Sequence, residues 1–235
     1  MTDVPMPTYE LDDGIAVIAL DDGKANVFST AALEVLEGHL DRVEADGARA
    51  LVLVGRPGRF SAGFDLGEMM GGDEGMRALV VRGARWWMRL YGLGIPTVAA
   101  CTGHALAGGA ITLLSCDVRI GADVPSKIGL NEVAIGMTLP KFIVELARDR
   151  ISTQHLTAVV TGTVYDPAGA VTVGFLDRVV DEAAVFDEAM AEARMLAERR
   201  TSAYAATKTK LRGALIATLL DGVVADMETV GSPTA

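Results

Sequence analysis

The chain has 235 residues, half of them apolar and 22% charged, so it is long enough for one sizeable hydrophobic core and is not a disordered protein. Its formal net charge of −10 argues against nucleic acid or an anionic membrane as a main partner, because binding to phosphate groups needs clustered lysine and arginine. The two cysteines, Cys101 and Cys116, fall in one apolar stretch and are expected to be buried thiols rather than a disulfide framework.

The N-terminal sequence does not have the pattern of a secretory leader. MTDVPMPTYELDDG contains acidic residues and prolines where a signal peptide has a basic region followed by an apolar core. We therefore expect a cytoplasmic protein. Residues 95–116 contain no Asp, Glu, Lys or Arg and are long enough for a membrane-spanning helix. Pro96, His104 and three glycines in this stretch argue against such a helix.

The N-terminal half is predicted to combine strands and helices. Residues 9–11 and 15–20 are typical of a β-hairpin with Asp-Asp-Gly at its turn. A helix is predicted from about Thr30, with Ser29 as its N-cap and one apolar face made by Leu33, Leu36, Leu40 and Val43. A continuous apolar strand at residues 50–54, a loop at 55–63 and a helix at 76–91 are expected to follow.

The central part of the chain joins an apolar strand to a helix through glycines. Residues 97–101 predict a fully buried strand, 102–107 a turn, and 108–115 a helix. The first turn of a helix has N–H groups without intrahelical partners, so this helix N-terminus is a candidate site for negative charge. Another short strand is predicted at residues 118–122.

The C-terminal half is predicted to be mainly helical. Helices are expected at residues 140–148, 153–160 and 167–173, then a short strand at 178–180, and helix from 184 to about 227 with a break at 199–202. The apolar positions that fit a buried face of the last helix are Leu211, Leu215, Ile216, Leu219 and Leu220, and they do not indicate whether that face packs within the chain or against another subunit. Periodicity alone predicts one α/β domain.

Three blocks follow one another along the chain: GRPGRFSAGFDLGEM at residues 55–69, GHALAGGAITLLSCDVRIGAD at 103–123, and KIGLNEVAIGMTLP at 127–140. In this order they resemble the signatures of the crotonase (enoyl-CoA hydratase/isomerase) superfamily. The resemblance implies an α/β fold with a ββα spiral core at residues 1–183, and a C-terminal helical region for trimerisation at residues 184–235. It also implies an acyl-CoA thioester as substrate, a homotrimer or hexamer, and no separate cofactor or metal.

The resemblance assigns two backbone N–H groups to an oxyanion hole. In the family, the N–H groups at the positions of Phe64 and Gly108 point at the thioester oxygen of an acyl-CoA. They stabilise the enolate that forms when a proton leaves the neighbouring carbon. On sequence alone, the glycine pair at 108–109 is more typical of simple packing of a helix against a strand.

The resemblance also assigns one acid/base residue and removes another. Glu132 matches the glutamate that transfers protons, whereas Ile111 stands where hydratases carry a second glutamate. One base with an oxyanion hole is the arrangement of a Δ3,Δ2-enoyl-CoA isomerase, in which Ile111 becomes an apolar wall of the pocket. Hydration, decarboxylation, thioester hydrolysis and non-catalytic acyl-CoA binding stay open as alternatives.

For coenzyme A, the family matches point to the region near the first block. The substrate-binding positions are Lys24, Ala25, Val27, Ala62, Asp65 and Leu66. Gly67 stands where family members often carry a lysine, so one phosphate contact is expected to be missing. Lys208 and Lys210 could supply charge or form a solvated face. Weaker candidates are His104, expected to be structural, and Trp86 and Trp87, expected in the core or at a subunit contact.

Overall fold

The largest sheet contains six strands, supplied by segments from both halves of the chain. In the computed structural model, which describes residues 6–230, their order is β1 (Thr8–Asp12), β2 (Ile15–Leu20), β4 (Ala50–Gly55), β7 (Thr97–Cys101), β9 (Val118–Ala122) and β11 (Arg178–Val180). β1 and β2 form the predicted antiparallel hairpin, and the other neighbours are parallel. Asp13 and Gly14 both have positive φ, at 47° and 77°, as a two-residue type I′ turn requires.

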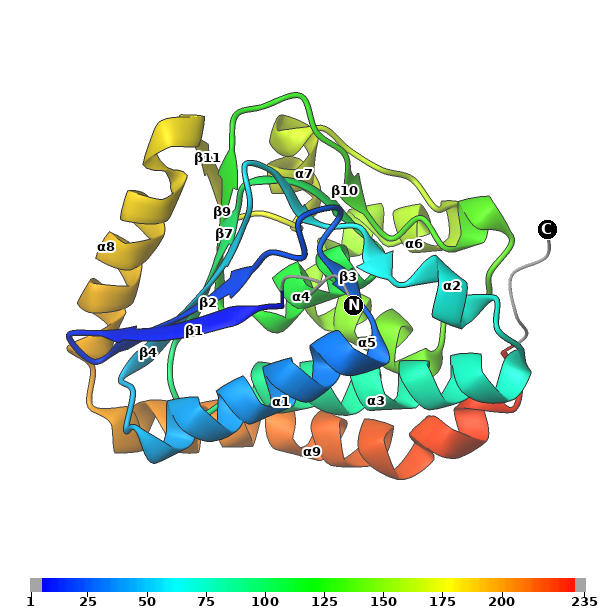
Figure 1. Ribbon diagram of the computed structural model, residues 1–235, viewed down its shortest axis with the longest axis horizontal. Helices are drawn as coiled ribbons and strands as arrows, with labels where there is room; N and C mark the ends of the chain where they lie inside the picture. Colours follow the sequence, from blue (N-terminus) through cyan, green and yellow to red (C-terminus); the bar gives the residue numbers. More distant parts are fainter. Residues whose placement is uncertain (1–5, 231–235) are drawn as a thin grey trace.

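Helices cover both faces of this sheet (Figure 1). Ala50 and Val52 of β4 pack with residues of α8 (Val185–Ala197), whereas Leu51 and Leu53 enter the larger core on the opposite face. There α1 (Thr30–Ala45), α3 (Asp73–Gly92) and α9 (Thr201–Met227) run side by side. The continuous apolar sequence of β4 is therefore explained by burial on both sides, as predicted.

A second sheet lies next to the first and completes a spiral. Its order is β10 (Ile128–Gly129), β8 (Gly103–Leu106) and β5 (Gly58–Ser61), with parallel pairing. Each of its strands follows a strand of the large sheet, and a helix then follows: α2 (Leu66–Met69) and α3, α4 (Gly108–Ser115), and α5 (Lys141–Arg150). These three strand–strand–helix turns form the ββα spiral that the resemblance implied. A short parallel pair, β3 (Val27–Phe28) with β6 (Gly63–Phe64), lies beside it.

Two segments that were predicted to be irregular connections contain β-strands instead. The expected turn at residues 102–107 contains β8, and the expected loop at 55–63 contains β5 and the start of β6. Both predictions were wrong because these strands are short and rich in glycine and polar residues. Their stability comes from pairing with segments more than twenty residues away, which a local pattern does not reveal.

The C-terminal helices mostly follow the prediction. α7 (Pro167–Val173) is capped by Asp166, and α8 and α9 are separated at the predicted break. The expected helix at 153–160 is instead a 3₁₀ turn, Thr153–His155, followed by α6 (Thr157–Thr161). Two other 3₁₀ turns are Val133–Ile135 and Glu182–Ala184. The two predicted regions, 1–183 and 184–235, include residues 1–5 and 231–235, which lie outside the described residues. Between residues 6 and 230, no helix is long and apolar enough to cross a membrane.

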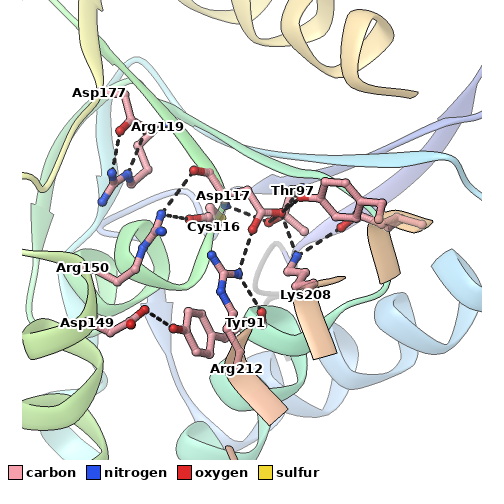
Figure 2. Close-up of polar contacts among 12 residues, drawn as sticks. Tyr91, Thr97, Cys116, Asp117, Arg119, Asp149, Arg150, Asp177, Lys208 and Arg212 are labelled. Atoms are coloured by element: carbon pink, nitrogen blue, oxygen red, sulfur yellow. Dashed lines mark hydrogen bonds and ion pairs between the residues drawn. The ribbon is translucent and has the colours of Figure 1, made fainter. Parts of the chain in front are cut away.

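A buried ion cluster joins α9 to the sheet (Figure 2). Asp117 accepts from Lys208 Nζ and Arg212 Nη1, each at 2.7 Å, and from the Tyr204 hydroxyl at 2.7 Å. It also accepts from the Thr97 amide at 2.9 Å. Burial raises the pKa of Asp117, but the two cations outweigh burial and hold that pKa below its usual value.

The cluster corrects the prediction for Lys208 on α9. Lys208 neither forms a solvated face nor is free to hold coenzyme A, because its side chain is 5% exposed and bound to Asp117. Within the single chain, Leu219 is 4% exposed and Leu211 is 72% exposed. The prediction left open whether this face packs within the chain or against another subunit, so for Leu211 it stays a prediction. Lys210 is exposed.

Candidate active site

One cavity of about 360 Å³ is lined by residues from all three sequence blocks, including Phe64, Ala107 and Glu132. Its wall is mostly apolar and has Glu132 as the single titratable group among the described residues that line it. The other lining residues are Ala25, Val27, Ala62, Phe64, Leu66, Met69, Met76, Val80, Ala107, Asn131, Ile135, Met137, Thr138, Pro140, Ile143 and Val230. A carboxylate in such surroundings is poorly solvated, and this is the setting in which a carboxyl group becomes an acid/base near neutral pH.

Glu132 is held by the backbone that follows β10. Its carbonyl accepts hydrogen bonds from the amides of Ile135 at 3.1 Å and Met137 at 2.9 Å, which fix the turn after it. The residue is 6% exposed, and its Oε2 atom has no hydrogen-bond partner among the described residues. Burial raises the pKa of Glu132 to about 7, and a contact with its own backbone amide acts weakly in the opposite direction. Glu132 can therefore exist in either protonation state at neutral pH.

The N-terminus of α4 meets β6 beside the cavity. A Cβ atom on Gly63 would lie 2.8 Å from the Ala107 Cβ and 3.1 Å from the Gly108 nitrogen. Gly63 has a φ of +100°, so both its conformation and the close approach require glycine. The structure thus brings the Gly63–Phe64 strand against the first turn of α4, where N–H groups lack intrahelical partners.

Ala107, the residue before α4, has an unusual backbone conformation. Its φ of 48° and ψ of −117° lie in a region that L-residues rarely adopt, and Ala107 lines the cavity. Two backbone hydrogen bonds hold it: its amide donates to the Gly129 carbonyl at 3.2 Å, and its carbonyl accepts from Ile111 N–H at 2.9 Å. Strained backbone that the surrounding structure enforces is frequent at functional sites.

Buried aromatic side chains pack against the Phe64 ring. The Phe64 ring meets Trp87 edge to face, with 5.3 Å between ring centroids, and Trp87 donates its indole N–H to Thr112 at 2.9 Å. Trp86 and Trp87 are both fully buried. The prediction that they belong to the core is confirmed.

The predicted coenzyme A positions are divided between two neighbouring cavities. Ala25, Val27, Ala62 and Leu66 line the same cavity as Glu132. Lys24 and Asp65 instead line an adjacent cavity of about 240 Å³, which also includes Val27. Asp65 has a structural role as well, because its side chain accepts from the Glu68 amide at 3.0 Å and caps α2.

Three further sequence candidates, Gly108, Ile111 and His104, are not among the described residues that line the Glu132 cavity, although Ala107 next to Gly108 is. The Ile111 side chain lies on α4, has no exposed surface and packs in the larger hydrophobic core. It is not one of the described residues that line the cavity, so the prediction that it forms part of the pocket wall was wrong. His104 accepts a hydrogen bond from the Lys127 amide at 3.1 Å within the second sheet. Burial lowers the pKa of His104, and the nearby Arg59 and Lys127 lower it further. This environment supports the structural interpretation of His104.

Sequence reasoning missed several residues of the cavity wall. Asn131 directly precedes Glu132, and its Oδ1 atom is buried without a hydrogen-bond partner among the described residues. Its place inside the third block was the signal that could have identified it. Met69, Met76, Met137 and Val230 come from four separate segments, and no local pattern connects them.

Comparisons with known proteins agree with this geometry. The model of the family described as enoyl-CoA hydratase/isomerase matches residues 10–235. A solved structure of an enoyl-CoA hydratase/isomerase family protein from Pseudomonas syringae has a TM-score of 0.91 and 39% identity, covering 95% of this chain and 97% of that chain. An enoyl-CoA hydratase from Mycobacterium marinum has a TM-score of 0.88 and 33% identity, covering 94% of this chain and 99% of that one.

A human relative carries the name of one reaction. Enoyl-CoA delta isomerase 1, mitochondrial, from Homo sapiens is 33% identical over 220 residues, which are 92% of this chain and 73% of the relative. The similar proteins thus include both isomerases and hydratases, on one fold. The chain belongs to the enoyl-CoA hydratase/isomerase family, also called the crotonase family, and is an enzyme of that family.

Proposed function

We propose that the protein is a Δ3,Δ2-enoyl-CoA isomerase that uses Glu132 as its only acid/base group. The observation that carries this proposal is the composition of the cavity, in which Glu132 is the one titratable group among the described lining residues. Moving a double bond by one position needs one proton to leave one carbon and return to another, and a single carboxyl group suffices for both transfers.

The proposed reaction has two steps. The Glu132 carboxylate removes a proton from C2 of a 3-enoyl-CoA, and the C–H electrons move into the thioester to give a dienolate. The N–H groups of Phe64 and Gly108 stabilise the negative oxygen, because preorganised donors in a dry site need little rearrangement as charge develops. Protonated Glu132 then returns the proton to C4, and the double bond ends between C2 and C3.

The apolar wall favours isomerisation over hydration. Syn addition of water to an enoyl-CoA uses two carboxylates, whereas the described residues of the cavity wall supply only one, Glu132. By the resemblance, Ile111 stands at the sequence position of the second. Isoleucine neither accepts nor donates a hydrogen bond, so it does not orient a water molecule for attack. Apolar side chains such as Val80 and Ile143 also limit the access of water to the dienolate.

The direct test is turnover of 3-enoyl-CoA by the purified protein, followed as formation of 2-trans-enoyl-CoA across the pH range 5–9. Since the carboxylate form of Glu132 is the base, kcat/KM is expected to rise with pH and to level off above an apparent pKa of about 7. A protein that binds the substrate but forms no 2-enoyl product at any pH would overturn the proposal.

The homotrimer or hexamer and the cytoplasmic location stay predictions.

A further inference from the structure

Val230 contributes to the wall of the candidate active site from the end of the last helix. It follows α9, is 2% exposed, and lines the same cavity of about 360 Å³ as Glu132. α9 runs beside α3 in the opposite direction, so that its end lies near the start of α3 (Figure 1). Met76 and Val80, in the first half of α3, line the cavity as well. The end of α9 and the first half of α3 therefore both supply apolar side chains to this cavity wall.

Hydrogen bonds fix the backbone that carries Val230. The Val230 amide donates to the Met227 carbonyl at 3.3 Å, and the Thr229 amide donates to the Asp226 carbonyl at 3.0 Å. The Asp226 carboxylate in turn accepts from the Lys141 amide at 2.6 Å, and so supplies a partner for one of the free N–H groups in the first turn of α5. Because α5 also contributes residues to the cavity wall, this carboxylate ties the segment before Val230 to another part of that wall.

The part of the wall that includes Val230 is not shared with the adjacent cavity. Val27 lines both cavities, whereas Met76, Ile143 and Val230 line the Glu132 cavity and not the adjacent one of about 240 Å³. In the proposed reaction the reacting carbons lie at Glu132, and coenzyme A extends toward the side that the two cavities share. The acyl carbons beyond C4 are then left to the unshared apolar wall, where the burial of methylene groups is favourable.

The side chains of this wall differ in how easily they can move. Met69 and Met76 are unbranched and adapt to the shape of a neighbour, whereas valine is stiff at χ1 and Val230 stands on hydrogen-bonded backbone. A stiff side chain on fixed backbone excludes an additional carbon instead of moving aside for it. We infer that Val230 is a specificity-determining residue, which limits the length of the acyl chain that this cavity accepts.

The test is the chain-length preference of Val230 variants, measured as kcat/KM for a series of 3-enoyl-CoA substrates of increasing chain length. Val230→Ala enlarges the cavity and is expected to raise the ratio of kcat/KM for a longer over a shorter substrate by about tenfold, the lower end of the effect of one methylene group in an apolar pocket. Val230→Phe fills the cavity and is expected to lower the same ratio. Val224→Ala, which truncates a 56% exposed valine of α9, is the matched control and is expected to leave the ratio unchanged.

The inference rests on the proposed function, so a second readout separates the two. Calorimetric affinities for saturated acyl-CoAs of the same chain lengths measure the preference of the cavity without turnover. Shifts of this preference in opposite directions in Val230→Ala and Val230→Phe support the inference even if the protein does not isomerise, in which case the proposed function alone fails. An unchanged preference in either variant, or an equal shift in Val224→Ala, overturns the inference. Should Val230→Phe not fold, Val230→Ile must shift the preference toward shorter chains.

Discussion

Glu132→Gln is expected to slow isomerisation by about 10²–10⁴-fold, the usual effect of losing a positioned general base. Glutamine has nearly the same shape as glutamate but cannot accept the proton from C2. The N–H groups of Phe64 and Gly108 remain in place, so the affinity for acyl-CoA is expected to change little. Steady-state rates combined with calorimetric binding of a saturated acyl-CoA measure the two effects separately.

The stability of the same variant provides an internal control. The pKa of Glu132 is about 7 in the folded protein against an ordinary value of 4.5, so the folded state binds more protons between these pH values. Stability therefore falls as pH rises through this window, and the penalty at pH 8 is on the order of 3 kcal/mol. Glu132→Gln removes it and is expected to be more stable than the parent at pH 8, with little difference below pH 4.

A matched substitution separates this effect from a general change of charge. Glu34→Gln removes an exposed carboxylate from α1 and is expected to change neither the rate nor the stability at pH 8 appreciably. Weak activity of Glu132→Gln in a destabilised protein would instead indicate that the substitution damages the fold. Near-normal isomerisation by a folded Glu132→Gln would remove Glu132 from the mechanism.

Asp117→Ala is expected to lower the free energy of unfolding by about 3–5 kcal/mol, because it leaves two buried cations without their carboxylate. Lys208 and Arg212 have side chains only 5% and 6% exposed, and both bind Asp117 at 2.7 Å. Denaturant titration at pH 7 measures the loss. Asp12→Ala is the control, since Asp12 pairs with Arg194 at the surface at 3.0 Å and such pairs contribute about 0–1 kcal/mol.

The pH dependence of stability tests the same cluster. The pKa of Asp117 in the folded protein is below the ordinary aspartate value of 3.8, so the carboxylate contributes stability above that pH. This contribution is lost as pH falls through the folded pKa. The Asp117→Ala variant should therefore show a smaller loss of stability on acidification than the parent. A loss at pH 7 no larger than that of Asp12→Ala would contradict the role of the cluster.

The main elements of the fold were readable from sequence where the signal was local. The Asp13-Gly14 turn, the Ser29 cap and the two-sided burial of β4 each depend on neighbouring residues, and each was predicted correctly. β5 and β8 were missed because pairing between distant segments stabilises them. The side chain of Asp117 attracts Lys208 and Arg212 into the interior, and no helical pattern shows that two cations on α9 share one carboxylate.

The candidate site, too, was predictable from the sequence only in part. The three blocks placed Glu132, Phe64 and Gly108 in the sequence, and the structure brings their elements together around one cavity. The cavity wall was not predictable, because Met76 on α3, Ile143 on α5 and Val230 beyond α9 meet only after the chain has folded. Ile111 was predicted from the resemblance to line the pocket, and its complete burial within α4 could not be inferred from its spacing to Gly108.

The central claim is that one carboxyl group makes this site an isomerase rather than a hydratase. The most direct measurement compares, in one preparation, the rate of converting 3-enoyl-CoA to 2-trans-enoyl-CoA with the rate of hydrating 2-trans-enoyl-CoA of the same chain length. The single-base account predicts that isomerisation is readily measured and that hydration is slow or absent. Hydration at a rate equal to or above that of isomerisation would contradict the account and would require a second catalytic group in the cavity.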